Sequence, residues 1–198
     1  MIDITHSFHK TLWFMEQYTK GSNFSFLEGN EQGKTSLDFL EEILNFEIEK
    51  EKYKRSLLQY HSFDNILHFE HSNIEYTLEA LKEEDSVLYN LPLRVNSMGI
   101  MIESNYTFTI KDCQKICVAS KPCTFFIFPK IVATGHLRMD EYPIIGPLKF
   151  IHTMFERKEN FRIIDILKGV LSKDAQTIDR RIRKMLLCQL LIIDKNEI

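Results

Sequence analysis

The end of the chain constrains its fold most, because it places one amphipathic helix before a short apolar segment. The sequence SKDAQTIDRRIRKMLLCQLLIIDKNEI predicts a helix whose Ile178, Ile182 and Met185 share one apolar face. The residues that follow this helix suffice for one strand, at 191–193, and not for a two-stranded wing. Any sheet in this half of the chain is therefore expected mainly from strands that precede the helices.

Two strands and two further helices are predicted upstream of that helix. CTFFIFPKIVATGHLRMD holds two strand-like runs around Gly135, and Pro129 is expected to make the first an edge strand or to interrupt it. In YPIIGPLKFIHTMFER, Pro143 is placed near a helix N-terminus. In NFRIIDILKGV, Asn160 and Gly169 delimit a short helix. The order of strand, strand, three helices and strand is winged-helix-like.

The first half of the chain is predicted to be mainly helical. SFHKTLWFMEQYTKG and TSLDFLEEILNFEIEKEKYKRSLLQY both have helical spacing of apolar residues, and the second begins with a possible capping box at Thr35 and Asp38. NILHFEHSNIEYTLEALKEED fits one helix or two short pieces, and LPLRVNSMGIMIESN predicts short strands around Asn96. TIKDCQKICVAS predicts a short helix capped by Thr109.

Charge divides the chain into two parts. Residues 1–118 carry 11 Lys and Arg against 19 Asp and Glu, whereas residues 119–198 carry 14 against 9. The balances of −8 and +5 indicate two units with different partners. We therefore predict an α+β fold, with a mainly helical N-terminal domain at 1–118. A small winged-helix-like domain, in which strands precede three helices, is predicted at 119–198.

Motifs for catalysis are absent from the sequence, including those for phosphate loops, dinucleotide binding, zinc proteases and serine hydrolases. Paired carboxylates such as Glu41 and Glu42 are typical of solvated faces. No apolar run approaches the roughly 20 residues needed to span a bilayer. The first residues lack the basic and apolar regions of a signal peptide. We expect a cytoplasmic protein that binds rather than catalyses.

Histidines and cysteines are the remaining candidates for metal chemistry. His61, His68 and His71 are close in sequence, but their spacing fits poorly with two ligands on one helical face. The four cysteines form no C-x2-C pair, which favours reduced thiols over a metal site. They are Cys113, Cys117, Cys123 and Cys188. We expect no metal or cofactor on this chain, and we keep a stand-alone metal enzyme as an alternative.

The second half also resembles a known peptide-recognition fold. FIFPKIVATGHLRMDEYPIIGPLKFIHTMFERKENFRIIDIL, followed by IDRRIRKMLLCQLLI, is similar to the peptide chaperone of pyrroloquinoline quinone biosynthesis in its strand pair, short helix and last helix. In that family a leader peptide adds as an extra strand to the sheet, beside the third helix. The resemblance implies a peptide groove between the sheet edge and the last helix. Its predicted residues are Phe126, Phe128, Lys130, Arg138, Arg180, Ile182, Arg183 and Lys184.

The likeness extends to most of the chain, over about residues 37–193. A long helix at LDFLEEILNFEIEKEKYKRSL and the extended LPLRVNSMGIMIESNYTFTIKD before this unit resemble the partner subunit of multinuclear non-heme iron-dependent oxidases. Those oxidases modify cysteines in ribosomal peptides, as in methanobactin and 3-thiaglutamate biosynthesis. The resemblance implies iron on a separate oxidase chain and a Cys-containing precursor peptide as ligand. Phe39, Phe46 and Tyr53 are the predicted oxidase contacts.

Each assignment has a plainer alternative. Phe126 and Ile182 also suit the core, the basic residues of the last helix suit a solvated face, and the aromatic residues of the long helix suit an internal contact. The main functional alternative is a winged-helix DNA-binding transcription regulator, which the Arg-rich last helix supports. The net charge of −3 and the missing wing oppose it. An unrelated interaction or structural protein is the third possibility.

Overall fold

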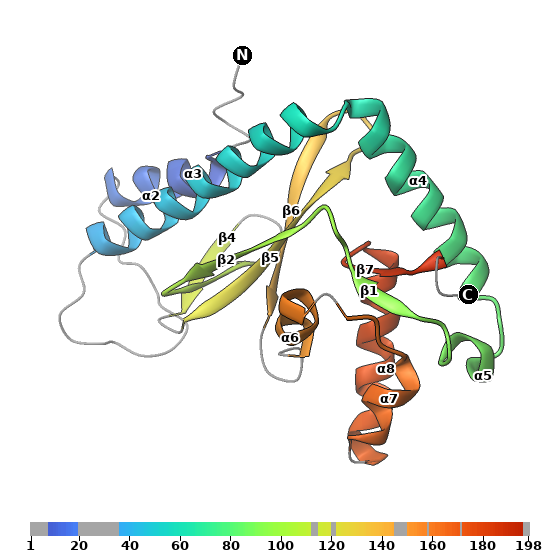
Figure 1. Cartoon of the computed structure of the whole chain (residues 1–198). Coiled ribbons are helices and arrows are strands. Elements are labelled where there is room, and N and C mark those ends of the chain that lie inside the picture. Colours follow the sequence, from blue (N-terminus) through green and yellow to red (C-terminus); the bar gives the residue numbers. More distant parts are fainter. Residues whose placement is uncertain are drawn as a thin grey trace. The chain divides into compact units, whose positions relative to one another are not determined.

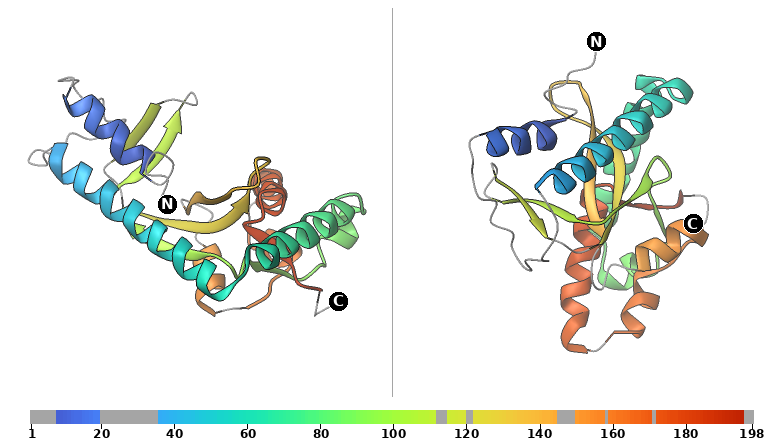
Figure 2. Two further views of the ribbon diagram at one scale, coloured as in Figure 1. Left: turned by 90° about the horizontal axis from the view of Figure 1, so that it is seen from above. Right: turned by 90° about the vertical axis from the view of Figure 1, so that its left-hand side faces the viewer.

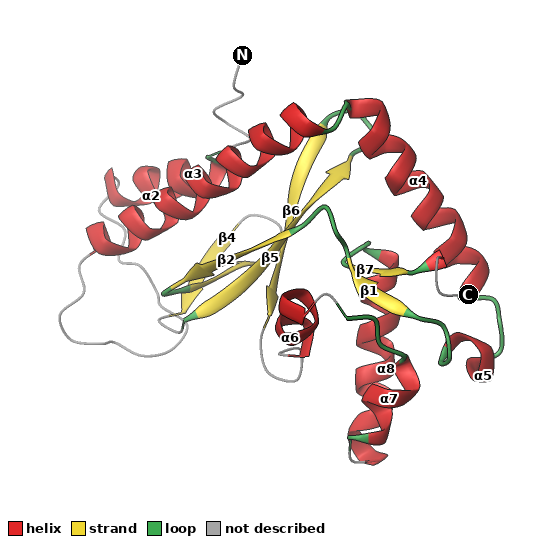
Figure 3. Cartoon of the chain, in the orientation of Figure 1, coloured by secondary structure: helices red, strands yellow, loops and turns green. Residues whose placement is uncertain are grey.

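The computed structural model describes residues 8–19, 36–111, 115–119, 122–144, 150–157, 159–170 and 172–195. The fold is α+β, as predicted (Figure 3). The helices are α2 (His9–Thr19), α3 (Ser36–Tyr60), α4 (Phe63–Ala80), α5 (Asp85–Leu88), α6 (Phe150–Arg157), α7 (Ile163–Lys168) and α8 (Ser172–Leu187). The strands are β1 (Leu93–Val95), β2 (Ile100–Ser104), β3 (Thr107–Lys111), β4 (Lys115–Ala119), β5 (Cys123–Ile131), β6 (Leu137–Ile144) and β7 (Leu191–Ile193).

The chain divides into two compact units, each made of two separate stretches of sequence. Unit 1 comprises Met1–Gln59 and Met101–Phe125, and unit 2 comprises Tyr60–Ile100 and Phe126–Ile198. The predicted domains are instead continuous stretches that meet at residues 118 and 119. The assignment of oxidase contact to residues 1–118 and of peptide binding to residues 119–198 stays a prediction.

Unit 1 is built around helix α3, whose prediction from helical periodicity is confirmed. Its apolar residues Phe39, Ile43 and Phe46 recur at helical spacing and are buried. The Phe39 ring lies 4.3 Å from the ring of Tyr106, and the Phe46 ring lies 4.9 Å from the ring of Phe125. Aromatic pairs therefore join α3 to the second stretch of the same unit.

A buried carboxylate fixes the start of α2 within unit 1. Glu47 of α3 is fully buried and accepts hydrogen bonds from the backbone N–H groups of Lys10 and Thr11, both at 3.0 Å. It also accepts a hydrogen bond from the Thr11 hydroxyl at 2.5 Å. The first N–H groups of a helix have no partner inside the helix. A negative charge at this end also interacts favourably with the helix dipole.

The prediction of a helix at TIKDCQKICVAS is wrong, because the described residues of this segment lie in strands β3 and β4. The two strands pair antiparallel, with Thr109 opposite Cys117 and Lys111 opposite Lys115. β-branched and aromatic residues dominate both strands, and their strand preference outweighs the capping signal at Thr109. Cys113 lies outside the described residues.

Strand β5 is the middle strand of a three-stranded sheet with the order β2–β5–β6. The expectation that Pro129 would make it an edge or interrupt it is wrong, because β5 is continuous through Pro129. β5 has nine residues and β2 only five, so β5 extends past its shorter neighbour and has positions where no N–H is needed. Pro143 was predicted near a helix start, but it lies in edge strand β6, and α6 begins at Phe150.

Strand β7 is present as predicted, and its partner is β1 of the first stretch of unit 2. They pair antiparallel, with Leu93 opposite Ile193 and Val95 opposite Leu191, and they lie side by side in Figure 1. Asn96, near which short strands were predicted, extends the contact because its N–H donates to the Leu190 carbonyl at 2.9 Å. A three-residue strand needs such a partner to satisfy its backbone groups. The stretch 60–100 therefore contributes strand β1 to unit 2, as the partner of the C-terminal strand β7.

The three C-terminal helices follow the predicted order of strand, strand, three helices and strand. Helices α7 and α8 contact each other, and they lie side by side in the right-hand view of Figure 2. Gly169 ends α7 as predicted, but Asn160 is not its cap, because Arg162 occupies the N-cap position. The Asn160 amide instead donates to Asp194 at 3.1 Å, beyond strand β7.

Candidate functional site

Strand β6 is an edge strand of the β2–β5–β6 sheet. Within the described part of the chain, no strand pairs with the side of β6 that faces away from β5. Pro143 lies in β6, and proline is tolerated in a sheet mainly at such edges because it has no N–H to donate. An edge strand presents backbone N–H and C=O groups that another extended segment can pair with.

Helix α8 brings one flank of its polar face near β6. Burial raises the pKa of the Tyr142 phenol, a negative charge on Cys188 raises it further, and the positive charge of Arg181 lowers it. Charges that act on Tyr142 in this way come from side chains close to β6. Arg181 and Lys184 lie on α8, and Cys188 directly follows its last residue, with its N–H donating to the Lys184 carbonyl at 3.0 Å. Their spacing of three and four residues places them on one side of the helix.

Cys188 is the thiol at this position, and it is half-buried. Burial raises its pKa, the positive charge of Lys130 on β5 lowers it, and the negative charge of Asp140 on β6 raises it. The Cys188 thiol also lies 3.4 Å from the Met185 carbonyl oxygen. The net raised pKa keeps Cys188 as a neutral thiol at neutral pH, which suits a packing role better than that of a nucleophile.

Alkylation of Cys188 by iodoacetamide is expected to be slow at pH 8. Its pKa is raised, so the reactive thiolate appears only at higher pH, and the rate at pH 8 should lie at least about five-fold below that of glutathione. Mass spectrometry of the peptide containing Cys188 measures this, with Cys188→Ser identifying the signal. A pH profile whose midpoint lies at or below that of glutathione would contradict the raised pKa.

Three of the predicted groove residues have side chains buried in unit 2. Phe126 and Ile182 are 0% exposed and Phe128 is 2% exposed. The Phe126 ring lies 5.8 Å from the ring of Phe128 and 5.7 Å from that of Phe155. Their apolar surface is therefore covered by the protein's own side chains. A peptide paired with β6 would contact these three side chains only if the core rearranged slightly.

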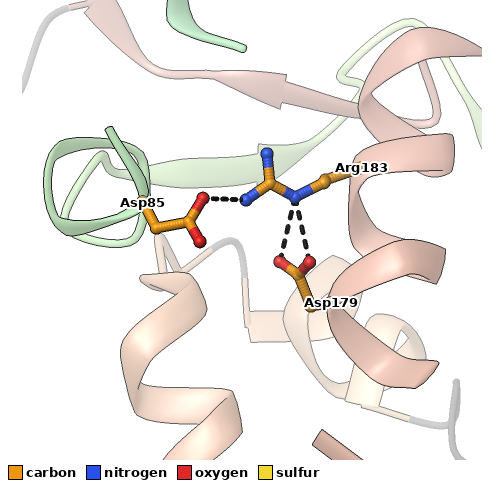
Figure 4. Close-up of polar contacts among 3 residues, drawn as sticks. All are labelled: Asp85, Asp179 and Arg183. Carbon is orange, nitrogen blue, oxygen red and sulfur yellow. Dashed lines mark hydrogen bonds and ion pairs between the residues drawn. The ribbon is translucent and has the colours of Figure 1, made fainter. Parts of the chain in front are cut away.

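The predicted groove residue Arg183 lies on the other flank of α8 and is engaged with its own chain (Figure 4). Its Nε donates to both oxygens of Asp179 at 3.0 and 3.2 Å, and its Nη2 donates to Asp85 of α5 at 2.5 Å. Burial lowers the pKa of Arg183, but hydrogen bonds with Asp179, Tyr89 and Asp85 raise it more. Arg183 thus joins α8 to α5.

The remaining predicted cations are at the surface of unit 2. Arg180 and Lys184 are exposed on α8, and Lys130 is half-buried near the end of β5. Arg138 is exposed on β6, and its Nε donates to Asp140 at 2.5 Å, which raises the pKa of Arg138. Exposed pairs of this kind are readily exchanged for other partners, because each is worth about 1 kcal/mol or less.

The predicted oxidase contacts lie on α3, in unit 1. Phe39 and Phe46 are buried against Tyr106 and Phe125, which is the internal contact given as the alternative. Tyr53 is half-buried, and burial raises the pKa of its phenol. Of the three, Tyr53 retains surface that a partner can reach.

Metal ligands do not converge within the described residues, where no group of three or more His, Cys, Asp and Glu side chains is arranged to hold an ion. His68 and His71 lie on helix α4, and His61 immediately precedes its N-cap residue Ser62. None of the described helices has the length and apolar content needed to cross a membrane.

Sequence reasoning missed three residues at the approach of α8 to β6, namely Arg181, Cys188 and Tyr142. Helical spacing relates Cys188 to Arg181 and Lys184, so this face was detectable from the sequence. Its direction toward β6 was not, because Tyr142 and Cys188 are far apart in sequence and meet only through the packing of unit 2.

Comparisons with known proteins find no match: no protein-family profile, curated protein or solved structure is significantly similar to this chain.

Proposed function

We propose that this chain binds an extended peptide by strand addition at β6, beside the flank of α8 that carries Arg181 and Lys184 and is followed by Cys188. The single observation that supports this most is the position of β6 at the end of the β2–β5–β6 order, next to that flank. In such complexes main-chain hydrogen bonds supply affinity, and neighbouring side chains supply selection.

Positive charge around the edge favours an acidic peptide. Lys130, Arg181 and Lys184 lie on the elements that border the proposed site, and the two on α8 are exposed. Each exposed contact contributes about 1 kcal/mol or less, so these cations steer and orient a peptide more than they hold it. The backbone of β6 provides most of the affinity in this proposal.

The peptide in this proposal is a ribosomally made, Cys-containing precursor, and the chain presents it to a multinuclear iron-dependent oxidase. This part derives from the resemblance to oxidase partner subunits, in which iron belongs to the other chain. The protein itself is then a non-catalytic cytoplasmic subunit of a heterodimer. A winged-helix-like arrangement of β5, β6 and α6 to α8 is part of the same proposal.

Binding is tested with synthetic peptides tiled across the short Cys-containing open reading frames beside the gene for this chain. We expect one peptide to shift backbone amide resonances of β6 and α8 and to bind with a micromolar Kd. N-methylation of alternate peptide nitrogens should weaken binding with a period of two, because only alternate N–H groups face β6. Uniform effects of methylation, or shifts confined to other elements, would contradict strand addition.

Charge reversal on α8 gives a directional prediction. The double change Arg181→Glu and Lys184→Glu should weaken binding of an acidic leader peptide about ten-fold at low salt, and less at high salt. Arg180→Glu is the control on another part of the helix surface, and it reverses one charge where the double variant reverses two. If calorimetry gave the control half of the double variant's loss in binding free energy, or more, only net charge would matter.

The oxidase partnership is tested separately by co-expression with an iron-oxidase gene from the same neighbourhood and a pull-down. We expect the two chains to co-purify and the peptide to be oxidised only when both are present. Turnover by this chain alone would contradict a non-catalytic role. A complex with genomic DNA fragments at micromolar protein and low salt would favour the DNA-binding alternative instead.

A further inference from the structure

A pocket of about 430 Å³ lies in unit 2 between α4 and the paired strands β1 and β7. This volume is in the range of small-molecule sites. Polar residues of α4, including His68 and Asn73, line it together with Arg94 of β1 and Lys195 beyond β7. Its apolar lining includes Phe69 of α4. The pocket therefore combines several donor groups with an apolar surface.

Positive charge exceeds negative charge in this pocket. Arg94 and Lys195 line it with one carboxylate, Asp194, which is buried. Arg94 Nη1 lies 3.7 Å from Asp194 Oδ2, and the same oxygen accepts a hydrogen bond from Asn160 at 3.1 Å. The carboxylate is thus shared, and it neutralises at most one of the two cations.

Lys195 is held in place by contacts that, within the described residues, include no carboxylate. Its Nζ donates to the Ser72 carbonyl oxygen at 3.2 Å and lies 4.6 Å from the centre of the Tyr76 ring. A carbonyl oxygen and an aromatic face orient an ammonium group, but neither carries a negative charge. A bound anion would supply this negative charge.

Two buried donors in residues that line the pocket have no hydrogen-bond partner among the described atoms. They are Asn73 Nδ2 and Arg94 Nε. Buried polar groups are nearly always paired, so a buried donor without an acceptor requires an explanation. Both residues line the pocket, so an acceptor bound there is a candidate partner for these donors.

We propose that this pocket binds a small organic anion. Its carboxylate or phosphate group is held by Arg94, Lys195 and Asn73, and its apolar body lies against Phe69 and Met98. A planar guanidinium matches both kinds of anion. The site is separate from the edge of β6, and it holds whether or not the chain binds a precursor peptide.

NMR titration of the full-length chain tests this site with four probes: hexanoate, hexyl phosphate, inorganic phosphate and hexanol. We expect saturable shifts of the Arg94 Nε–H and Asn73 amide signals with hexanoate or hexyl phosphate, a weaker response to inorganic phosphate, and none with hexanol. Comparing the first two identifies the preferred head group. An equal response to hexanol overturns the proposal. So does the absence of any shift with all four probes at 10 mM, because a specific site is expected to have a Kd below roughly this concentration.

Arg94→Gln should weaken binding of the better probe about ten-fold, because it removes the charged fork and leaves a polar side chain. Arg138→Gln on β6 is the matched control and should leave the affinity unchanged. If Arg94→Gln disturbs the pairing of β1 and β7, Lys195→Met decides the question, with an expected loss of at least about five-fold. Wild-type affinity in a folded Arg94→Gln or Lys195→Met variant overturns the assignment.

Discussion

Glu47→Ala is expected to lower the free energy of unfolding of unit 1 by about 3 kcal/mol. The side chain is fully buried and accepts three hydrogen bonds, two from the backbone of Lys10 and Thr11 and one from the Thr11 hydroxyl. Alanine removes both acceptor oxygens, and with them all three hydrogen bonds, and leaves two N–H groups at the start of α2 without this partner. Each such buried group costs about 1–3 kcal/mol, partly offset by water.

Urea denaturation and hydrogen exchange measure the effect of this change. The amides of Lys10 and Thr11 should lose protection in Glu47→Ala more than amides in unit 2 do. Glu49→Ala is the matched control, because Glu49 is on the same helix but exposed, and its ion-pair partner among the described residues is Lys52. It should change stability by about 0.5 kcal/mol or less. Similar losses in both variants would contradict the role assigned to Glu47.

Glu47 also shows why sequence reasoning reached α3 but not its polar contacts. Helical periodicity is local, so the spacing of apolar residues predicted the helix. It did not identify the buried face, because Phe39 and Phe46 are buried although they were predicted to contact an oxidase. Within that pattern Glu47 reads as one more solvated acid. Its burial depends on α2, more than 30 positions earlier in sequence, and no local signal records that contact.

The strands show the same division between local and distant information. Strand β7 was predictable from its apolar run, but its partner β1 lies about 100 positions away. The hairpin of β3 and β4 was predicted as a helix, because a possible cap at Thr109 was given more weight than the strand preference of its neighbours. The prediction of site residues near β6 was incomplete for the same reason. It identified the basic face of α8, but not the flank with Arg181 that approaches Tyr142.

Gly99→Ala is expected to cost about 3 kcal/mol of stability in unit 2. A methyl group at Gly99 would lie 2.2 Å from Phe126 Cζ, and 2.7 and 2.9 Å from two further atoms of the ring. The ring is fully buried and contacts the rings of Phe128 and Phe155, so it has little room to move. Phe126 therefore requires glycine at position 99, which agrees with a core role for a residue first predicted to line the peptide groove.

A double-mutant cycle separates this steric conflict from a general loss of stability. Phe126→Leu alone removes ring contacts and should cost roughly 1–2 kcal/mol, but it frees space next to position 99. In the double variant the losses should be less than additive by about 1–2 kcal/mol, because the smaller side chain accommodates the methyl group. Gly169→Ala is the control, since its methyl group would meet only the Ile166 carbonyl oxygen at 3.6 Å. Additive losses, or a Gly99→Ala variant as stable as Gly169→Ala in urea, would mean that Phe126 does not fill the space beside Gly99.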